Sequence, residues 1–307
     1  MKEIRIFAPA TVANVGPGFD LLGLAVERPG DRVTVIRRDS PGVSISSISG
    51  DDGRLPLEPE KNTAGIAALE VLKRAGATDG VELQIEKRMP LGSGLGSSAS
   101  SAAAAAVGTN MLLGEPLTGE QLVSCCVEAE AIVSGRHADN VAPAVLGGLI
   151  LVRQVDPLKI VRLPIPEGLA VCVVTPEFEL PTRQAREALP KEVPMAKSIE
   201  NASNLATLIH ALHSGDLELL RGALHDPIVT PARAPLIPGC LDVIAAATEA
   251  GALGSSISGA GPSVLALCPN LDATDAVAAA MVEAFRHAGL NASTVRSLAD
   301  CPGARPE

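Results

Sequence analysis

Aromatic residues are almost absent from this chain of 307 residues, which has no tryptophan, no tyrosine and four phenylalanines. Hydrophobic residues nevertheless amount to 47%, so the core must consist mainly of alanine, valine, leucine and isoleucine. Proteins that bind single-stranded nucleic acid by base stacking need aromatic platforms. The composition therefore argues against that class of function.

Positive charge is also scarce, with 25 Lys and Arg against 35 Asp and Glu and a formal net charge of −10. The sequence has no basic tract and no basic stripe, whereas nucleic-acid phosphates require such a surface. We therefore expect no nucleic-acid partner. An acidic chain can still bind a nucleotide, because a helix N-terminus and a few arginines supply positive potential locally.

The six cysteines form no Cys-x-x-Cys pair, which argues against a zinc site and against a disulfide framework. We expect them to be buried free thiols in a reducing cytoplasm. No apolar run approaches the roughly 20 residues that span a bilayer, and the first residues alternate like a strand instead of forming a signal segment. These features predict a cytoplasmic protein with no membrane partner. They leave the oligomeric state open, a homodimer included.

Length and patterning indicate one large domain or two moderate ones of mixed α and β structure. Val81, Leu83 and Ile85 alternate with polar residues, which predicts a half-buried strand, and an alanine-rich helix is expected over residues 97–113. A turn is expected at residues 29–31. Proline-containing segments near residues 156–166 suggest a junction, so we place an N-terminal domain at residues 1–155 and a C-terminal domain at residues 156–307.

A glycine-rich segment joins the predicted strand to the predicted helix. It consists of Pro90, Leu91, Gly92, Ser93, Gly94, Leu95, Gly96, Ser97, Ser98, Ala99 and Ser100. Glycines let a backbone approach an anion closely, and Ser97 and Ser98 lie where N-caps are expected. The free N–H groups and the dipole of the helix then favour a phosphate. The alternative is a glycine turn that only caps the helix.

Two familiar phosphate-binding patterns do not fit this segment. No GxxxxGK[ST] sequence occurs anywhere, so it is not a Walker A loop. It is not a dinucleotide fingerprint either, because Ser97 stands where a third glycine is required.

Two further glycine-rich segments carry polar residues. Asn14 and Asp20 stand inside an otherwise apolar stretch at residues 8–23, and buried polar groups of this kind either bond locally or face a ligand. Residues 256–263 have the sequence Ser-Ile-Ser-Gly-Ala-Gly-Pro-Ser, which alone is typical of a hairpin turn. Together and in this order, the three segments resemble the three motifs of the GHMP kinases, which include galactokinase, homoserine kinase, mevalonate kinase and phosphomevalonate kinase.

Within this family the resemblance is greatest to the homoserine kinases, through residues 14–20, 137–143 and 182–190. It implies an α+β, two-domain GHMP kinase fold with the active site in the cleft between the domains. It also implies ATP-dependent phosphorylation of the side-chain hydroxyl of L-homoserine to O-phospho-L-homoserine, a step of threonine biosynthesis. Two alternatives stay open: a kinase of another small alcohol such as mevalonate, and a non-catalytic GHMP-fold regulator that only binds a ligand.

The resemblance assigns the residues that would hold ATP and Mg²⁺. Residues 90–100 would bind the phosphates. Asn62 would contact the adenine, although it also fits a helix N-cap. Ser98 and Glu130 would hold Mg²⁺, with Glu128 as a nearby rival for the second ligand.

The resemblance places five residues around the amino-acid substrate: Asn14, Asp20, Asn140, Arg186 and Arg233. Arginine binds carboxylates bidentately, and Asp20 can accept the ammonium group. Arg183 is a nearby alternative to Arg186.

Three residues are expected to be catalytic: Ser98, Asn140 and Arg186. Phosphoryl transfer depends mainly on positioning and on neutralisation of charge, so the chemistry does not require a side-chain base. Asp139 is the local carboxylate that could act as one, and we expect it not to.

Overall fold

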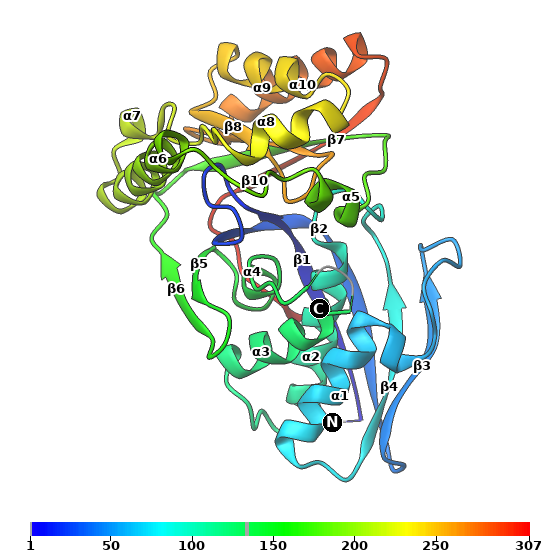
Figure 1. Ribbon diagram of the computed structural model, residues 1–307. Helices are drawn as coiled ribbons and strands as arrows, with labels where there is room; N and C mark the ends of the chain where they lie inside the picture. The colour runs from blue at the N-terminus through cyan, green and yellow to red at the C-terminus, as the bar shows by residue number, and fades with distance from the viewer. Residues whose placement is uncertain (1, 133–134) are drawn as a thin grey trace.

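Two β-sheets organise the chain in the computed structural model, which describes residues 2–132 and 135–307 (Figure 1). The first sheet has the order β11-β1-β2-β4-β3, with β5 paired to β2 and β6 paired to β5. Its strands are β1 (Glu3–Ala13), β2 (Leu22–Arg38), β3 (Gly42–Ser49), β4 (Gly80–Glu86), β5 (Leu149–Gln154), β6 (Lys159–Leu163) and β11 (Arg305–Pro306).

The second sheet is built from the later part of the chain and has the order β10-β7-β9-β8. Its strands are β7 (Ala170–Pro176), β8 (Gly254–Ile257), β9 (Val264–Cys268) and β10 (Ala292–Leu298). The edge strand β10 lies against β2, so the two sheets meet there. Glu27 on β2 donates its backbone N–H to the Ser297 hydroxyl on β10 over 3.1 Å.

Three helices pack on the first sheet: α1 (Thr63–Ala75), α2 (Ser97–Leu112) and α4 (Val141–Leu146). Helix α3 (Gly119–Glu130) packs on these three helices, and a short 3₁₀ turn (Pro59–Lys61) precedes α1 (Figure 1). The central helix, α2, is buried almost all round between the sheet and α1 and α3. A helix that is apolar on every side belongs in a core. Its alanines allow close approach, and a Cβ on Gly108 would lie 2.5 Å from a Val35 methyl.

The helices of the second half are α5 (Thr182–Glu187), α6 (Met195–Ser214), α7 (Leu217–Leu220), α8 (Val229–Arg233), α9 (Cys240–Glu249) and α10 (Ala273–His287), with a 3₁₀ turn at Ala234–Leu236. Helices α9 and α10 cover the second sheet, and α6 lies beside it (Figure 1). Phe285 and Met281 of α10 are completely buried there. The described helices include none that is both long and apolar enough to cross a lipid bilayer.

The predicted strand at residues 81–85 and the predicted helix over residues 97–113 are confirmed as β4 and α2. The predicted turn at residues 29–31 is wrong, because β2 continues through it to Arg38. Its pairing with β1 shifts at Pro9 and Ala10, so the strand is irregular at this point without ending.

The division at residues 155 and 156 stays a proposal. The first sheet takes β6 and β11 from the later side of that division. All six cysteines lie in the described residues, and each is a buried free thiol as expected.

Candidate active site

The loop between β4 and α2 bends through glycines in an unusual backbone conformation. Gly92, Gly94 and Gly96 have φ values of 66°, 78° and 65°, in the left-handed region that glycine enters without a Cβ penalty. A Cβ on Gly96 would lie 1.9 Å from the Oγ1 atom of Thr11. The loop therefore approaches β1 too closely for any other residue at this position.

The loop ends at the N-terminus of α2, where the N-cap is Gly96 and not Ser97 or Ser98 as expected. No side chain among the described residues caps the helix, and the first N–H groups of a helix have no acceptor within it. Ser97 and Ser98 form its first turn and line a pocket. The uncapped N–H groups and the helix dipole favour an anion at this point.

The other two glycine-rich segments pack against this loop. The Ser258 hydroxyl donates to the Gly94 carbonyl over 2.7 Å. The Asn14 amide donates to the Gly259 carbonyl over 2.8 Å. Folding therefore joins three segments that lie far apart in the sequence.

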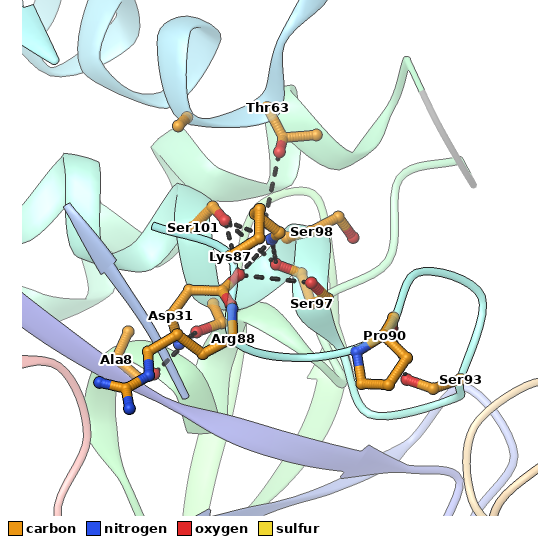
Figure 2. A network of polar contacts seen from close by, with 12 residues as sticks. Ala8, Asp31, Thr63, Lys87, Arg88, Pro90, Ser93, Ser97, Ser98 and Ser101 are labelled. Carbon is orange, nitrogen blue, oxygen red and sulfur yellow. Dashed lines mark hydrogen bonds and ion pairs between the residues drawn. The ribbon is translucent and has the colours of Figure 1, made fainter. Parts of the chain in front are cut away.

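A buried network fixes the first turn of α2 from below (Figure 2). Lys87 donates to the Asp31 carboxylate, to the Ser97 carbonyl over 2.7 Å and to the Ser101 hydroxyl over 2.6 Å. Asp31 also accepts from the Ser101 hydroxyl over 2.8 Å and from the Arg88 N–H over 2.9 Å. All three donors of Lys87 are thus used within the protein, and they hold the helix in place.

Burial raises the pKa of Asp31 and lowers the pKa of Lys87, and their attraction opposes both shifts. A buried ion pair persists when hydrogen bonds satisfy its remaining polar atoms. Ser97 and Ser101 of α2 supply those bonds here, as Figure 2 shows.

Sequence reasoning missed Asp31 and Lys87, although a signal was present. Side chains alternate between the two faces of a strand. Lys87 follows Leu83 and Ile85 in the buried register of β4, and Asp31 precedes Val33 in that of β2. A charged residue at a strand position whose neighbours two residues away are buried and apolar indicates a polar network inside the core.

The pocket beside the loop has a volume of about 310 Å³. It is lined by the whole segment Pro90–Ser98 and by residues from other parts of the chain, among them Asn62, Lys87, Glu130, Asn140, Thr182 and Gly259. From the sequence, Thr182 was noted only as the first residue of the segment 182–190, and nothing in the sequence around it marks it as a pocket residue.

Asn62 is the N-cap of α1, which confirms one of its two predicted roles. Its side chain accepts from the Ala64 N–H over 3.0 Å and donates to the Pro56 carbonyl over 3.0 Å. It also lines the pocket, as Pro56 does. Contact with an adenine stays a prediction.

Ser98 and Glu130 both line this pocket, whereas Glu128 pairs with Arg136 over 2.6 Å and 2.8 Å and does not. The described residues contain no group of three or more His, Cys, Asp or Glu side chains that could hold a metal ion. Mg²⁺ usually keeps several waters and takes one or two carboxylates together with substrate phosphates. A hydroxyl and a carboxylate beside a phosphate loop fit that requirement.

The predicted acceptor residues form a cluster next to this pocket, with an arrangement that the sequence did not predict. Asp20 and Arg186 pair with each other through two hydrogen bonds of 3.0 Å and 3.3 Å. The Asn14 side chain accepts from the Asp20 N–H over 3.0 Å and holds its loop in place. His137 lies 3.6 Å from the same carboxylate.

Arg233 is almost completely buried, at 2% exposure, and bonds to backbone carbonyls. It donates to Ala185 over 3.1 Å and to Gly259 over 2.8 Å. Burial, reinforced by the nearby Arg186, lowers its pKa to about 10. Both guanidinium groups lie over the Phe19 ring, with the Cζ of Arg233 5.2 Å and the Cζ of Arg186 5.5 Å from the ring centroid. Arg183 instead points to solvent and pairs with Glu187.

Asn140 is the N-cap residue of α4, but its side chain bonds to β1 and not to the helix. Its carbonyl oxygen accepts from the Thr11 hydroxyl over 2.8 Å. Its neighbour Asp139 is buried, which raises the pKa of that carboxyl to about 7, with a further contribution from the charge of Asp20. Thr11 is a further residue at the site that sequence reasoning missed, because a threonine in a strand is ordinary.

The chain matches the family model of the GHMP kinases N terminal domain over residues 62–148 and that of the GHMP kinases C terminal over residues 208–287. It is 46% identical to a homoserine kinase of Chloroherpeton thalassium over 297 residues, which cover 93% of each chain. It is 48% identical to a homoserine kinase of Arabidopsis thaliana over 296 residues, which cover 94% of this chain and 80% of that protein.

A solved structure of similar shape is a homoserine kinase from Cytophaga hutchinsonii. The TM-score is 0.97 at 43% identity, and the match covers 100% of this chain and 98% of that one. The likeness therefore extends over both sheets and over the site between them.

Proposed function

Because this chain belongs to the GHMP kinase family, we propose that it transfers the γ-phosphoryl group of ATP to the side-chain hydroxyl of L-homoserine. The products are ADP and O-phospho-L-homoserine. The choice of substrate rests on one observation. The Asp20 carboxylate and the Arg186 guanidinium lie together, 3.0 Å apart at their closest, beside the predicted phosphate site.

A paired carboxylate and guanidinium match the two charges of an amino acid. The substrate ammonium would replace Arg186 at Asp20, and the substrate carboxylate would replace Asp20 at Arg186. Arg186 is 38% exposed and Asp20 is 30% exposed, so both are accessible to a ligand. The Arg233 side chain already donates to two backbone carbonyls. It would therefore contribute positive charge near the substrate carboxylate without bonding to it.

The nucleotide phosphates would lie on the N-terminus of α2, against residues 90–100. Ser98 and Glu130 would hold Mg²⁺, which neutralises phosphate charge when it is bound. Asn62 and its neighbours would face the adenine end of the pocket.

The remaining residues would position the reacting hydroxyl. Asn140 lies between Thr11 and the phosphate loop, where its amide group can donate to the substrate oxygen. The hydroxyl proton can pass to the transferred phosphoryl group, so Asp139 need not accept it. This proposal gives Asn140, Arg186 and Ser98 the catalytic roles.

The test is a coupled ADP-release assay with L-homoserine, L-serine, L-threonine, mevalonate, galactose and 4-hydroxybutanoate. The last compound keeps the hydroxyl and the carboxylate of homoserine and lacks the ammonium. One charge-assisted hydrogen bond contributes about 1.5–3 kcal/mol, so kcat/KM should favour homoserine over 4-hydroxybutanoate by roughly 10- to 100-fold.

Asp20→Asn should remove most of that preference, and Asp39→Asn, the same change at an exposed residue, should leave it intact. Turnover of mevalonate equal to that of homoserine would refute the substrate assignment. Failure of all six alcohols to release ADP would favour a ligand-binding regulator.

A further inference from the structure

A second pocket, of about 520 Å³, lies at the seam between the two sheets. The described residues that line it include four arginines and no carboxylate: Phe7, Arg28, Pro29, Gly30, Arg32, Arg88, Thr294, Val295 and Arg296. The chain as a whole has a net charge of −10. Such a concentration of guanidinium groups is unexpected on an acidic protein.

Strand alternation places these arginines behind the phosphate loop. Asp31 and Lys87 point to α2, so their neighbours Arg32 and Arg88 point to the opposite face of the sheet. Figure 2 shows the Arg88 side chain extending away from the network around Asp31. Arg28 enters the pocket from the irregular part of β2, where an unpaired stretch can turn a side chain away from the sheet.

Two of the four guanidinium groups are already neutralised. Arg32 pairs with Glu307, and Arg296 pairs with Asp275. Within residues 2–132 and 135–307, the side chains of Arg28 and Arg88 form no hydrogen bond or ion pair, although the charge of Glu307 also acts on Arg28. Four positive charges against two negative ones leave a local charge of +2.

We propose that this pocket binds a small oxyanion of two or more negative charges, a phosphate or a polycarboxylate, through Arg28 and Arg88. Arginine binds both groups bidentately. The bound anion is coupled to the phosphate loop, because the Arg88 N–H donates to Asp31 and Asp31 holds the first turn of α2 through Ser101. Occupancy therefore changes the KM for ATP.

The test uses inorganic phosphate and malonate as probes at constant ionic strength. Isothermal titration is done on the full chain with its catalytic pocket filled by Mg²⁺ and a non-hydrolysable ATP analogue. The variant is Arg28→Gln/Arg88→Gln. The control is Arg153→Gln/Lys159→Gln, which removes two positive charges from exposed residues that do not line the pocket. Circular dichroism and thermal unfolding check that each variant is folded.

We expect saturable binding of at least one probe to the wild-type chain and to the control. The Arg28→Gln/Arg88→Gln variant should bind at least ten-fold more weakly, because it loses two charged donors. Binding of phosphate alone would identify a phosphate site, and binding of both probes a general dianion site. A saturating probe should change the KM for ATP at least two-fold in the wild-type chain and not in this variant.

Three results would overturn the proposal. They are the absence of saturable binding to the wild-type chain, equal affinity of the Arg28→Gln/Arg88→Gln variant and the control, and an unchanged KM for ATP at saturating probe. The titration needs no turnover, so it stands even if the chain phosphorylates a different alcohol.

Discussion

Replacing Lys87 by methionine removes the cation from the network beneath the phosphate loop while it keeps most of the side-chain volume. The Asp31 carboxylate then stays buried among Ser97, Ser101 and the Arg88 N–H with no positive charge beside it. The first turn of α2 also loses a donor to the Ser97 carbonyl. Both losses act on the same few residues, so stability and activity should fall together.

The magnitude follows from burial. The Lys87 and Asp31 side chains are 2% and 0% exposed, and removal of one partner of a buried ion pair typically costs about 3–5 kcal/mol. The surface pair of Arg37 and Asp79 is 46% and 36% exposed, and such a pair contributes about 0–1 kcal/mol. Arg37→Met is therefore a matched control.

The assay is urea denaturation at several pH values, together with kcat/KM for ATP. Lys87→Met should lower the free energy of unfolding by about 3–5 kcal/mol at neutral pH. The loss should shrink in acid. Without Lys87 the folded-state pKa of Asp31 lies above its unfolded value, so the folded state is favoured at low pH and loses stability as the pH rises.

Asp31→Asn/Lys87→Met leaves no charge in this buried network, so it should recover part of the stability that Lys87→Met loses. Its kcat/KM for ATP should stay low, because the donor to the Ser97 carbonyl is still missing. The reasoning is refuted if Lys87→Met costs no more than Arg37→Met, or if its stability loss is the same at pH 5 and pH 8.

Variants at three further positions test the active site. Ser98→Ala should lower kcat severely and leave homoserine binding nearly unchanged, since Ser98 is a proposed Mg²⁺ ligand; an unchanged kcat at saturating Mg²⁺ would contradict this. Asp139→Asn should reduce kcat by less than about ten-fold in steady-state kinetics, below the roughly 10²–10⁴-fold of a general base. Because the folded-state pKa of Asp139 is raised to about 7, wild-type stability falls as the pH rises to 7, and the stability of Asp139→Asn relative to wild type should increase by about 2–3 kcal/mol from pH 5 to pH 8; a constant difference in urea denaturation would contradict the shift. Gly96→Ala should cost about 1–2 kcal/mol from backbone strain alone, and more from its contact with the Thr11 hydroxyl; Thr11→Ala in the same chain should restore part of that loss.

The sequence by itself determined the family, and through it the α+β, two-domain fold and the reaction class, all of which are confirmed. It could do so because each of the three glycine-rich segments behind the resemblance is local in the sequence, and the segment at residues 90–100 is the clearest of them. A strand, a glycine turn and a helix N-terminus follow one another at residues 81–100, and their conformations depend on glycine backbone freedom and on short-range alternation.

Local sequence patterns gave wrong predictions at two places where the backbone is compatible with more than one conformation. Residues 29–31 have the composition of a turn, yet β2 continues through them because β1 pairs on both sides of the irregularity. The helix after the glycine loop was expected to have a serine N-cap. Its N-cap is Gly96, where the close approach of Thr11 leaves no room for a side chain.

Only the tertiary structure decided which charged residues pair. Asp20 and Arg186 are 166 residues apart, and Asp31 and Lys87 are 56 apart. Alternation can mark Asp31 and Lys87 as buried, but it does not say that they meet. Strand order and helix packing set those distances, and ion pairing depends on distance and burial more than on residue type. The same reason explains why the arginines of the second pocket, from β2, β10 and the residues after β4, were not connected in the sequence.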